Sequence, residues 1–327
     1  MDIETLPFQS FQSLERALRT NAPYIRVTGT HSSVYLAALA CHSCLQNSHR
    51  PILFVFAHAA AEQSFQEALA FFDPTLTTHS LPAFDVSPYS HLYPNRNKIG
   101  ERLFWLYRAQ SARPGEIFTA SVEALCQNTI PQELFLDLSF SLKVGDDLPH
   151  NFSQQLETLG YMPSPTVESY GQYAIRGGIV DIFPTSSTTG VRLELFGDTI
   201  DSMRTFDPES QRSSSTLSIV DIPPAREVLF IEDHFAEFIQ RLTKNWKDRP
   251  VQDRDKQEII HQLQRRHYFH GLEFLLPFAY EHLQQPLHFF MSSLQVFFLD
   301  PTEIKRSFDD TFSHFKSEAD ESQDLVI

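Results

Sequence analysis

The sequence predicts an α/β protein in which a mainly antiparallel α/β unit is inserted into a parallel α/β unit. Strands and helices alternate over the first ~135 residues, which is typical of a parallel sheet. From residue 173 onward strands follow one another without intervening helices, which indicates an antiparallel sheet. Beyond Pro223-Pro224 the pattern is mostly helical and then returns to strands. We therefore expect a first unit over 1–136, an inserted unit over 137–222, and a segment over 223–327 that completes the first unit.

The first unit begins with a strand, a turn and a helix. A short apolar run predicts a strand over 24–27, and apolar residues at helical spacing predict a helix over 33–46. The run Ile52–Phe56 is apolar throughout, which predicts a strand buried on both faces. A helix over 59–72 must stop at Asp73-Pro74, because the residue before a proline avoids the α region.

Helix and strand patterns continue to alternate along the chain. A helix over 99–112 stops before Pro114-Gly115, and a further strand is expected over 116–119. In the inserted unit we expect a strand over 139–144 and a short helix over 152–159. Gly160 takes the position where helices adopt a left-handed cap. Strands are expected over 173–183 and 191–206.

The last segment is mostly helical. Helices are expected over 235–246 and 253–266, and strands over 287–290 and 296–299. The final stretch, 300–327, holds eight acidic against three basic residues. We therefore expect its end to be solvated or frayed.

The charge balance argues against a general affinity for nucleic acid. Lys and Arg number 26 against 41 Asp and Glu, for a net charge of −15, so the chain lacks the attraction to phosphate backbones on which sequence-independent binding depends. No apolar run approaches the ~18 residues of a membrane span, and the amino end lacks a secretory signal. Three cysteines, Cys41, Cys44 and Cys126, cannot form a disulfide framework. These features predict a soluble protein of a reducing cytoplasm, with no membrane partner.

The turn between the first strand and the first helix looks like a degenerate phosphate-binding P-loop. A working P-loop needs glycines whose backbone N–H groups surround the phosphates, a lysine for the β- and γ-phosphates, and a hydroxyl for Mg²⁺. Here Gly29 is the single glycine, His31 replaces the second glycine, Ser32 replaces the lysine, and Ser33 alone keeps a usable hydroxyl. We expect no nucleotide binding at this loop, and neither a catalytic residue nor a cofactor in this chain.

Cysteines and histidines do not form a convincing metal site. Cys41 and Cys44 have the spacing of half a site, but zinc needs four ligands, and both lie along the apolar stripe of the predicted helix. Core cysteines are therefore favoured. His261, His267 and His270 form a loose cluster without a glutamate at zinc-protease spacing, so we expect no metal there either.

No arrangement of nucleophile, histidine and acid has a local signature in this sequence. The isolated general-base candidates, Asp181, Asp198 and Asp207, lie in or beside turns, where aspartate is commonly structural.

The segment around residues 190–203 is the most informative. Val191, Leu193 and Leu195 alternate with Arg192, Glu194 and Phe196, so the two sets point to opposite faces of a strand. Gly197-Asp198 is a two-residue hairpin signal. Across that turn, simple counting places Phe196 opposite Thr199, Glu194 opposite Asp201, and Arg192 opposite Met203.

The outward face of this hairpin has two interpretations. It combines an aromatic side chain, an arginine and a like-charged pair, Glu194 and Asp201, that attracts a cation; Arg176, just before Gly177-Gly178, is a candidate to lie alongside. An arginine and an exposed aromatic on a rigid sheet are typical of a protein-binding hot spot. Alternatively, one of the chain's own helices covers this face and Phe196 belongs to the core. Alternation alone does not decide between them.

The sequence around this hairpin resembles the amino-terminal, UvrB-like module of the bacterial transcription-repair coupling factors (the Mfd family). The specific runs are QYAIRGGIVDIFP at 172–184, RLELFGDTIDS at 192–202 and FDPESQR at 206–212. Shorter matches extend over almost the whole chain: LP at 81–82, SPY at 87–89, GERL at 100–103, PARE at 224–227 and GLEFLLP at 271–277. UvrB shares this arrangement but keeps an intact P-loop and a long DNA-clamping hairpin. The loop here is degenerate and 89–99 is too short for that hairpin.

The resemblance implies a function in nucleotide excision repair. In that family the middle part of the module binds UvrA, and the implied contact residues are Arg176, Arg192 and Phe196, with Glu194 and Asp201 as further candidates. The implied role is to recruit UvrA to RNA polymerase stalled at DNA lesions. RNA polymerase and DNA would be contacted through an ATP-driven translocase and other regions absent from these 327 residues, so we expect an excised fragment or a natural truncation.

Two other hypotheses stay open. The alternative from another class is a UvrB-like, ATP-dependent DNA repair helicase subunit, against which the missing P-loop lysine argues. A third hypothesis is a regulatory module that folds back on the motor until UvrA arrives, which the sequence does not separate from recruitment.

Overall fold

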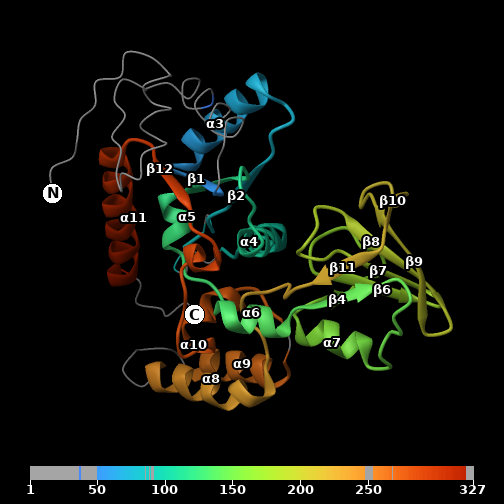
Figure 1. The fold of residues 1–327 in the computed structure, drawn as a ribbon. Coiled ribbons are helices and arrows are strands. Elements are labelled where there is room, and N and C mark those ends of the chain that lie inside the picture. The colour runs from blue at the N-terminus through green and yellow to red at the C-terminus, as the bar shows by residue number, and fades with distance from the viewer. Residues whose placement is uncertain are drawn as a thin grey trace.

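The structure is a computed structural model that describes residues 37, 50–84, 86, 87, 89, 92–246, 253–266 and 268–321. Two units lie side by side, one built on a parallel sheet and one on an antiparallel sheet (Figure 1). The predicted strand over 24–27 and the degenerate P-loop, Gly29, His31, Ser32 and Ser33, lie outside the described residues, as do Cys41, Cys44 and His267. Of the predicted helix over 33–46 only Ala37 is described, and it is helical and buried.

Four parallel strands form the sheet of the first unit, in the order β12, β1, β3, β2. β1 (Ile52–Phe56), β3 (Ile117–Ser121) and β12 (Gln295–Phe298) were predicted within one or two residues, whereas β2 (Thr78–Leu81) was not predicted. Because β12 pairs with β1, a strand from near the end of the chain completes this sheet.

Helices cover both faces of the parallel sheet (Figure 1). Leu53 and Val55 enter a large core that includes α4 (Arg96–Gln110), and Phe54 enters a second core that includes α3 (Ala59–Phe72). The prediction that β1 is buried on both faces is therefore confirmed. α3 has the predicted bounds. α4 starts three residues earlier than predicted, because the Asn95 side chain accepts a hydrogen bond from the backbone N–H of Asn97 (2.8 Å) and caps the helix there.

The remaining helices of the first unit gather below the sheet in the view of Figure 1 or flank it. α8 (Glu232–Asn245) and α9 (Asp253–Gln264) were predicted, whereas α5 (Val122–Cys126), α6 (Gln132–Leu138), η2 (Leu272–Leu275) and α10 (Leu276–Ala279) were not.

One prediction for the last segment is wrong. The expected strand over 287–290 is a 3-10 turn, η3 (Pro286–Phe289), because Pro286 fits the first turn of a helix and the Gln285 and His288 side chains form a capping box. The end of the acidic stretch, expected to be solvated or frayed, lies at 322–327, outside the described residues; residues 301–321 form a long, largely exposed helix, α11 (Pro301–Glu321). Ser307 is buried and donates to the carbonyl of Ala57 at 2.7 Å, so the acids mark a solvated face of a docked helix.

The second unit is built on a six-stranded sheet in the order β10, β9, β8, β7, β6, β5, antiparallel except for the β5–β6 pair. One face of this sheet packs on α7 (Phe152–Thr158) and on a separate two-stranded sheet of β4 (Phe140–Lys143) and β11 (Ile219–Ile222). Gly160 has φ of 85°, as expected for the cap of α7. The strands of the large sheet are β5 (Met162–Pro163), β6 (Gln172–Arg176), β7 (Ile179–Ile182), β8 (Gly190–Phe196), β9 (Thr199–Phe206) and β10 (Ser213–Leu217).

The two units are in close contact at α4. Tyr170 of the second unit lies so near Gly100 that a Cβ added there would come within 2.2 Å of the Tyr170 Cβ. Only glycine fits at that position, so the second unit is seated directly on the helix that covers the parallel sheet.

Candidate partner-binding surface

One face of the six-stranded sheet contains the residues predicted as a hot spot. The register places Arg176 opposite Ile179 and Ile179 opposite Glu194, and residues directly opposite each other share a face. Because alternate residues of a strand also share a face, Arg192, Glu194 and Phe196 lie on the same side. We call the surface formed by Arg176, Ile179, Arg192, Glu194 and Phe196 the arginine face.

The opposite face of β8 points into the core, as the alternation predicts. Val191 and Leu193 are 1% and 0% exposed and belong to the core of the second unit. Leu195 is partly buried against the same core. The orientation of the arginine face is thus determined by burial of the alternate residues.

One buried carboxylate holds both arginines of this face. Asp181, on β7, is 0% exposed and lies opposite Arg192. Arg192 donates from Nε and Nη2 to the two carboxylate oxygens at 2.7 and 3.0 Å, which is a bidentate pair. Arg176 donates to the same carboxylate and, from Nη1, to the carbonyl of Pro165 at 3.1 Å. Both guanidinium groups are therefore held in place, while the side chains of Arg176 and Arg192 stay 50% and 20% exposed.

An aromatic ring beneath Arg192 completes its support. The guanidinium carbon lies 5.1 Å from the ring centroid of Phe206, within the range of a cation–π contact. Gly190 makes room for this ring, because a Cβ there would come within 2.2 Å of it. The hydrogen bonds to Asp181 raise the pKa of Arg192 above its usual value, although burial acts in the opposite direction. Arg192 therefore stays charged at physiological pH.

Phe196 is 83% exposed at the end of β8. The alternative in which a helix covers this face and Phe196 belongs to the core is therefore wrong. Ile179, between Arg176 and Glu194 on the same face, is 40% exposed. The arginine face thus combines two fixed cations with two exposed apolar side chains.

The predicted pairing across the β8–β9 hairpin is correct only next to the turn. Phe196 lies opposite Thr199, as predicted, but Glu194 lies opposite Ser202 instead of Asp201. The register shifts at this point, which leaves Asp201 as the extra residue of a β-bulge. Glu194 accepts a hydrogen bond from Ser202 Oγ at 2.7 Å, so the predicted like-charged pair is not formed.

The same shift changes the neighbour of Arg192, which lies opposite Arg204 instead of Met203. The acid that holds Arg192 is therefore Asp181 on the other neighbouring strand, and not Glu194 or Asp201. Sequence reasoning assigned Asp181 no part in the site. A signal was present, because a two-residue turn at Gly177-Gly178 places Ala174 opposite Asp181, on the same face as Arg176.

Asp207 has the structural role expected of it, since its Oδ1 accepts hydrogen bonds from the N–H and Oγ of Ser210, both at 2.7 Å. Asp198 stands in the β8–β9 turn, also as expected. In the described part of the chain no three His, Cys, Asp or Glu side chains are grouped to hold a metal.

A serine, a histidine and a glutamate meet in the first unit. His58 Nδ1 lies 3.1 Å from Ser307 Oγ, and its Nε2 lies 3.6 Å from Glu303 Oε1. Ser307 is buried and its hydroxyl donates to the carbonyl of Ala57. This serine has no access to a substrate, so the group is best explained as the attachment of α11 to the start of α3.

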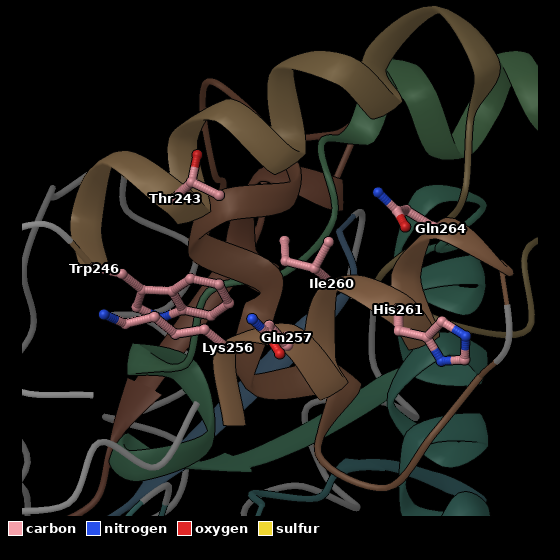
Figure 2. A pocket seen from close by; sticks show the side chains of 7 residues that line it. All are labelled: Thr243, Trp246, Lys256, Gln257, Ile260, His261 and Gln264. Carbon is pink, nitrogen blue, oxygen red and sulfur yellow. The ribbon is translucent and has the colours of Figure 1, made fainter. Parts of the chain in front are cut away.

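A pocket of about 430 Å³ lies between α8 and α9 (Figure 2). It contains no paired acid and base, and its histidine, His261, belongs to the loose cluster singled out in the sequence. The side chains that line it are Thr243, Trp246, Lys256, Gln257, Ile260, His261 and Gln264. The arginine face is therefore the stronger candidate, because its polar groups are fixed by a buried partner.

Comparison with known proteins gives a consistent result. The sequence model of the UvrB interaction domain matches residues 140–228, which include the whole arginine face. The chain is 38% identical over 154 residues to the transcription-repair-coupling factor of Myxococcus xanthus, covering 47% of this chain and 13% of that protein. It is 30% identical over 209 residues to that of Escherichia coli, covering 64% and 18% respectively. For Staphylococcus aureus the identity is 27% over 230 residues, covering 70% and 19%.

The predicted resemblance to the transcription-repair coupling factors is therefore confirmed, and so is the α/β fold. The matches span less than a fifth of the length of these relatives. In the part of the chain that the structure describes, no helix has the length and apolar character needed to cross a bilayer.

Proposed function

We propose that the arginine face binds UvrA, and that this chain thereby recruits the excision-repair machinery to RNA polymerase stalled at DNA lesions. The protein would act in the cytoplasm, without a cofactor of its own. RNA polymerase and DNA would be contacted through regions outside this chain, and in the same proposal those regions include the ATP-driven translocase.

The observation behind this proposal is the arrangement at Asp181. A carboxylate with 0% exposure holds two arginines whose side chains remain accessible. Binding a partner therefore requires little additional ordering of Arg192, which lowers the entropic cost at the interface. Arg192 and Phe196 are four residues apart on one strand, about 13 Å at ~3.3 Å per residue. That separation suits a compact epitope in which a few residues dominate the binding energy.

The comparisons support the same assignment. The arginine face lies inside the segment that matches a UvrB interaction domain. The relatives named as transcription-repair-coupling factors match 154 and 209 residues of this chain. The rival hypothesis of a UvrB-like helicase needs a lysine where this sequence has Ser32, and nothing in the arginine face resembles a nucleotide site.

A titration of UvrA with the intact chain tests the proposal. We expect saturable binding by the wild-type chain and affinity about thirtyfold weaker for Phe196→Ala, because a central aromatic anchor typically contributes roughly 2 kcal/mol or more. Phe71→Ala is a matched control: Phe71 is 84% exposed, like Phe196, but lies on α3 in the first unit. Failure of the wild-type chain to bind, or equal affinities for the two variants, would contradict the proposal.

A further inference from the structure

A third arginine lies on the same face of the six-stranded sheet. Arg204, on β9, stands directly opposite Arg192 in the strand register and opposite Thr216 on the other side. Its side chain therefore shares the face of Arg192. Arg204 is exposed, and no described carboxylate forms an ion pair with it.

Arg204 differs from the two other arginines in its electrostatic surroundings. Arg176 and Arg192 share the charge of Asp181, whereas among the described residues Arg204 has no acid as an ion-pair partner and faces another arginine. Like charges directly opposite each other destabilise a sheet. None of the contacts described therefore gives Arg204 a role in stabilising the fold.

The charge of the surface points to the chemistry of its partner. Among the residues that the strand register pairs on this face, three arginines accompany two acids, Asp181 and Glu194, a balance of 3 − 2 = +1 without the bulge residue Asp201, in a chain whose net charge is −15. Glu194 is already engaged by Ser202. The free positive charge is thus concentrated at Arg204, on the same face of the sheet as the exposed apolar side chains of Ile179 and Phe196.

We propose that Arg204 is a further contact residue of the arginine face and pairs with a carboxylate on the bound protein. This inference rests on the proposed function and identifies the partner's contact surface as acidic beside an apolar area. A guanidinium offers a bidentate fork to such a carboxylate. A DNA duplex is the less fitting ligand, because it presents a row of phosphates that requires several aligned cations. A single free arginine on a face with two exposed apolar side chains matches one carboxylate.

Because no acid in the described part of the chain holds Arg204, it should act mainly through charge. Complementary charges at the edge of an interface speed association and make affinity dependent on salt, more than they slow dissociation. Removing Arg204 is expected to weaken UvrA binding while leaving the rest of the face in place. The same change should leave thermal stability unchanged or slightly raised, since Arg192 loses a like-charged neighbour.

The test is a titration of UvrA with Arg204→Ala, Arg204→Lys and Arg204→Glu variants of the full chain, at about 50 and about 300 mM NaCl, where the screening length differs by more than twofold. We expect affinity about five- to tenfold weaker for Arg204→Ala at low salt, and a larger loss for Arg204→Glu. Arg204→Lys should restore much of the binding, and Arg204→Ala should reduce the salt dependence. Arg113→Glu, an exposed arginine of the first unit, is the control and should bind like the wild type.

Each contrary result has a distinct meaning. If all three Arg204 variants bind UvrA like the wild type while Phe196→Ala binds weakly, Arg204 is not a contact and only this inference is wrong. If the wild-type chain does not bind UvrA, this inference and the proposed function are both wrong. If the Arg204 variants instead lose salt-sensitive binding to a labelled duplex, the free arginine recognises phosphate and the acidic-partner assignment is overturned.

Discussion

Arginine–carboxylate pairs occur in both units of this molecule, but they differ in which group is buried. In the first unit Arg102 and Glu227 are 0% and 1% exposed, so both charges are removed from water. In the second unit only the carboxylate of Asp181 is buried, and the arginines reach the surface. The difference indicates two roles. An ion pair in which both charged groups are buried holds segments of the chain together, whereas a pair in which only the carboxylate is buried presents its arginine to a partner.

The contacts of Arg102 support the first half of that comparison. Its Nη1 donates to the carbonyl of Pro82 at 3.0 Å and to Gln127 Oε1 at 3.3 Å. Glu227 in turn accepts a hydrogen bond from Thr129 Oγ1 at 3.0 Å. Segments far apart in the sequence therefore converge on one ion pair. Breaking it leaves a charge in the interior without compensation.

The largest expected effect is therefore on stability, from Arg102→Ala. We expect a loss of about 3–5 kcal/mol in the free energy of unfolding, because the carboxylate of Glu227 stays buried without its cation. Urea denaturation followed by circular dichroism measures this. Arg113→Ala, at an exposed arginine, should change the same quantity by less than ~0.5 kcal/mol. A similar small change for Arg102→Ala would show that the buried pair is not structural.

Asp181→Ala is the corresponding test in the second unit. Its cost in stability should be smaller, about 1–3 kcal/mol, because Arg176 and Arg192 can turn toward water once the acid is gone. Its effect on UvrA binding should exceed that of Arg176→Ala, since both guanidinium groups lose their fixed positions. An Asp181→Ala variant that binds UvrA like the wild type would show that orientation by this carboxylate is unimportant.

The smallest expected effect concerns Glu62, a buried acid that forms no ion pair with a described cation. Glu62 is 4% exposed and accepts hydrogen bonds from Thr119 Oγ1 at 2.6 Å and Ser80 Oγ at 2.5 Å. Burial raises the pKa of Glu62 above its ordinary value of 4.5, against the effect of the two hydroxyls. Its protonated form therefore stabilises the fold below the unfolded-state pKa, and this contribution is lost as the pH rises through the raised pKa.

Thermal unfolding from mildly acidic to neutral pH measures this effect. Relative to the wild type, Glu62→Gln should gain stability as the pH rises, because the amide stays neutral. Glu67→Gln, at an exposed glutamate of the same helix, is the control. A stability difference between Glu62→Gln and the wild type that does not change with pH would contradict the assignment.

The elements predicted correctly are those whose pattern is local. The apolar run of β1 and the Asp73-Pro74 stop of α3 are visible in the sequence itself. β2 was missed because Thr78-His79-Ser80 has no apolar pattern; it forms by pairing with β3, and Trp105 Nε1 donates to the carbonyl of His79 at 3.1 Å. Such long-range contacts leave no mark in a short window of sequence.

The candidate site was likewise predicted only where its pattern is local. Alternation along β8 and the turn at Gly197 correctly placed Phe196 opposite Thr199. The bulge that follows could not be counted from the turn. It arises because Ile200 and Met203, three residues apart on β9, are both fully buried in the same core, which strict alternation does not allow. The shared carboxylate of Asp181 likewise becomes apparent only when three strands are aligned.

The most direct test of the central claim measures UvrA binding and thermal unfolding on the same three variants, Arg176→Ala, Arg192→Ala and Phe196→Ala. If the arginine face is a partner-binding surface supported by a buried acid, all three should bind UvrA more weakly than the wild type. Phe196→Ala should then also unfold within about 2 °C of the wild type, since a surface substitution changes stability by less than ~0.5 kcal/mol. Unchanged UvrA affinity for both Arg176→Ala and Arg192→Ala would contradict the account.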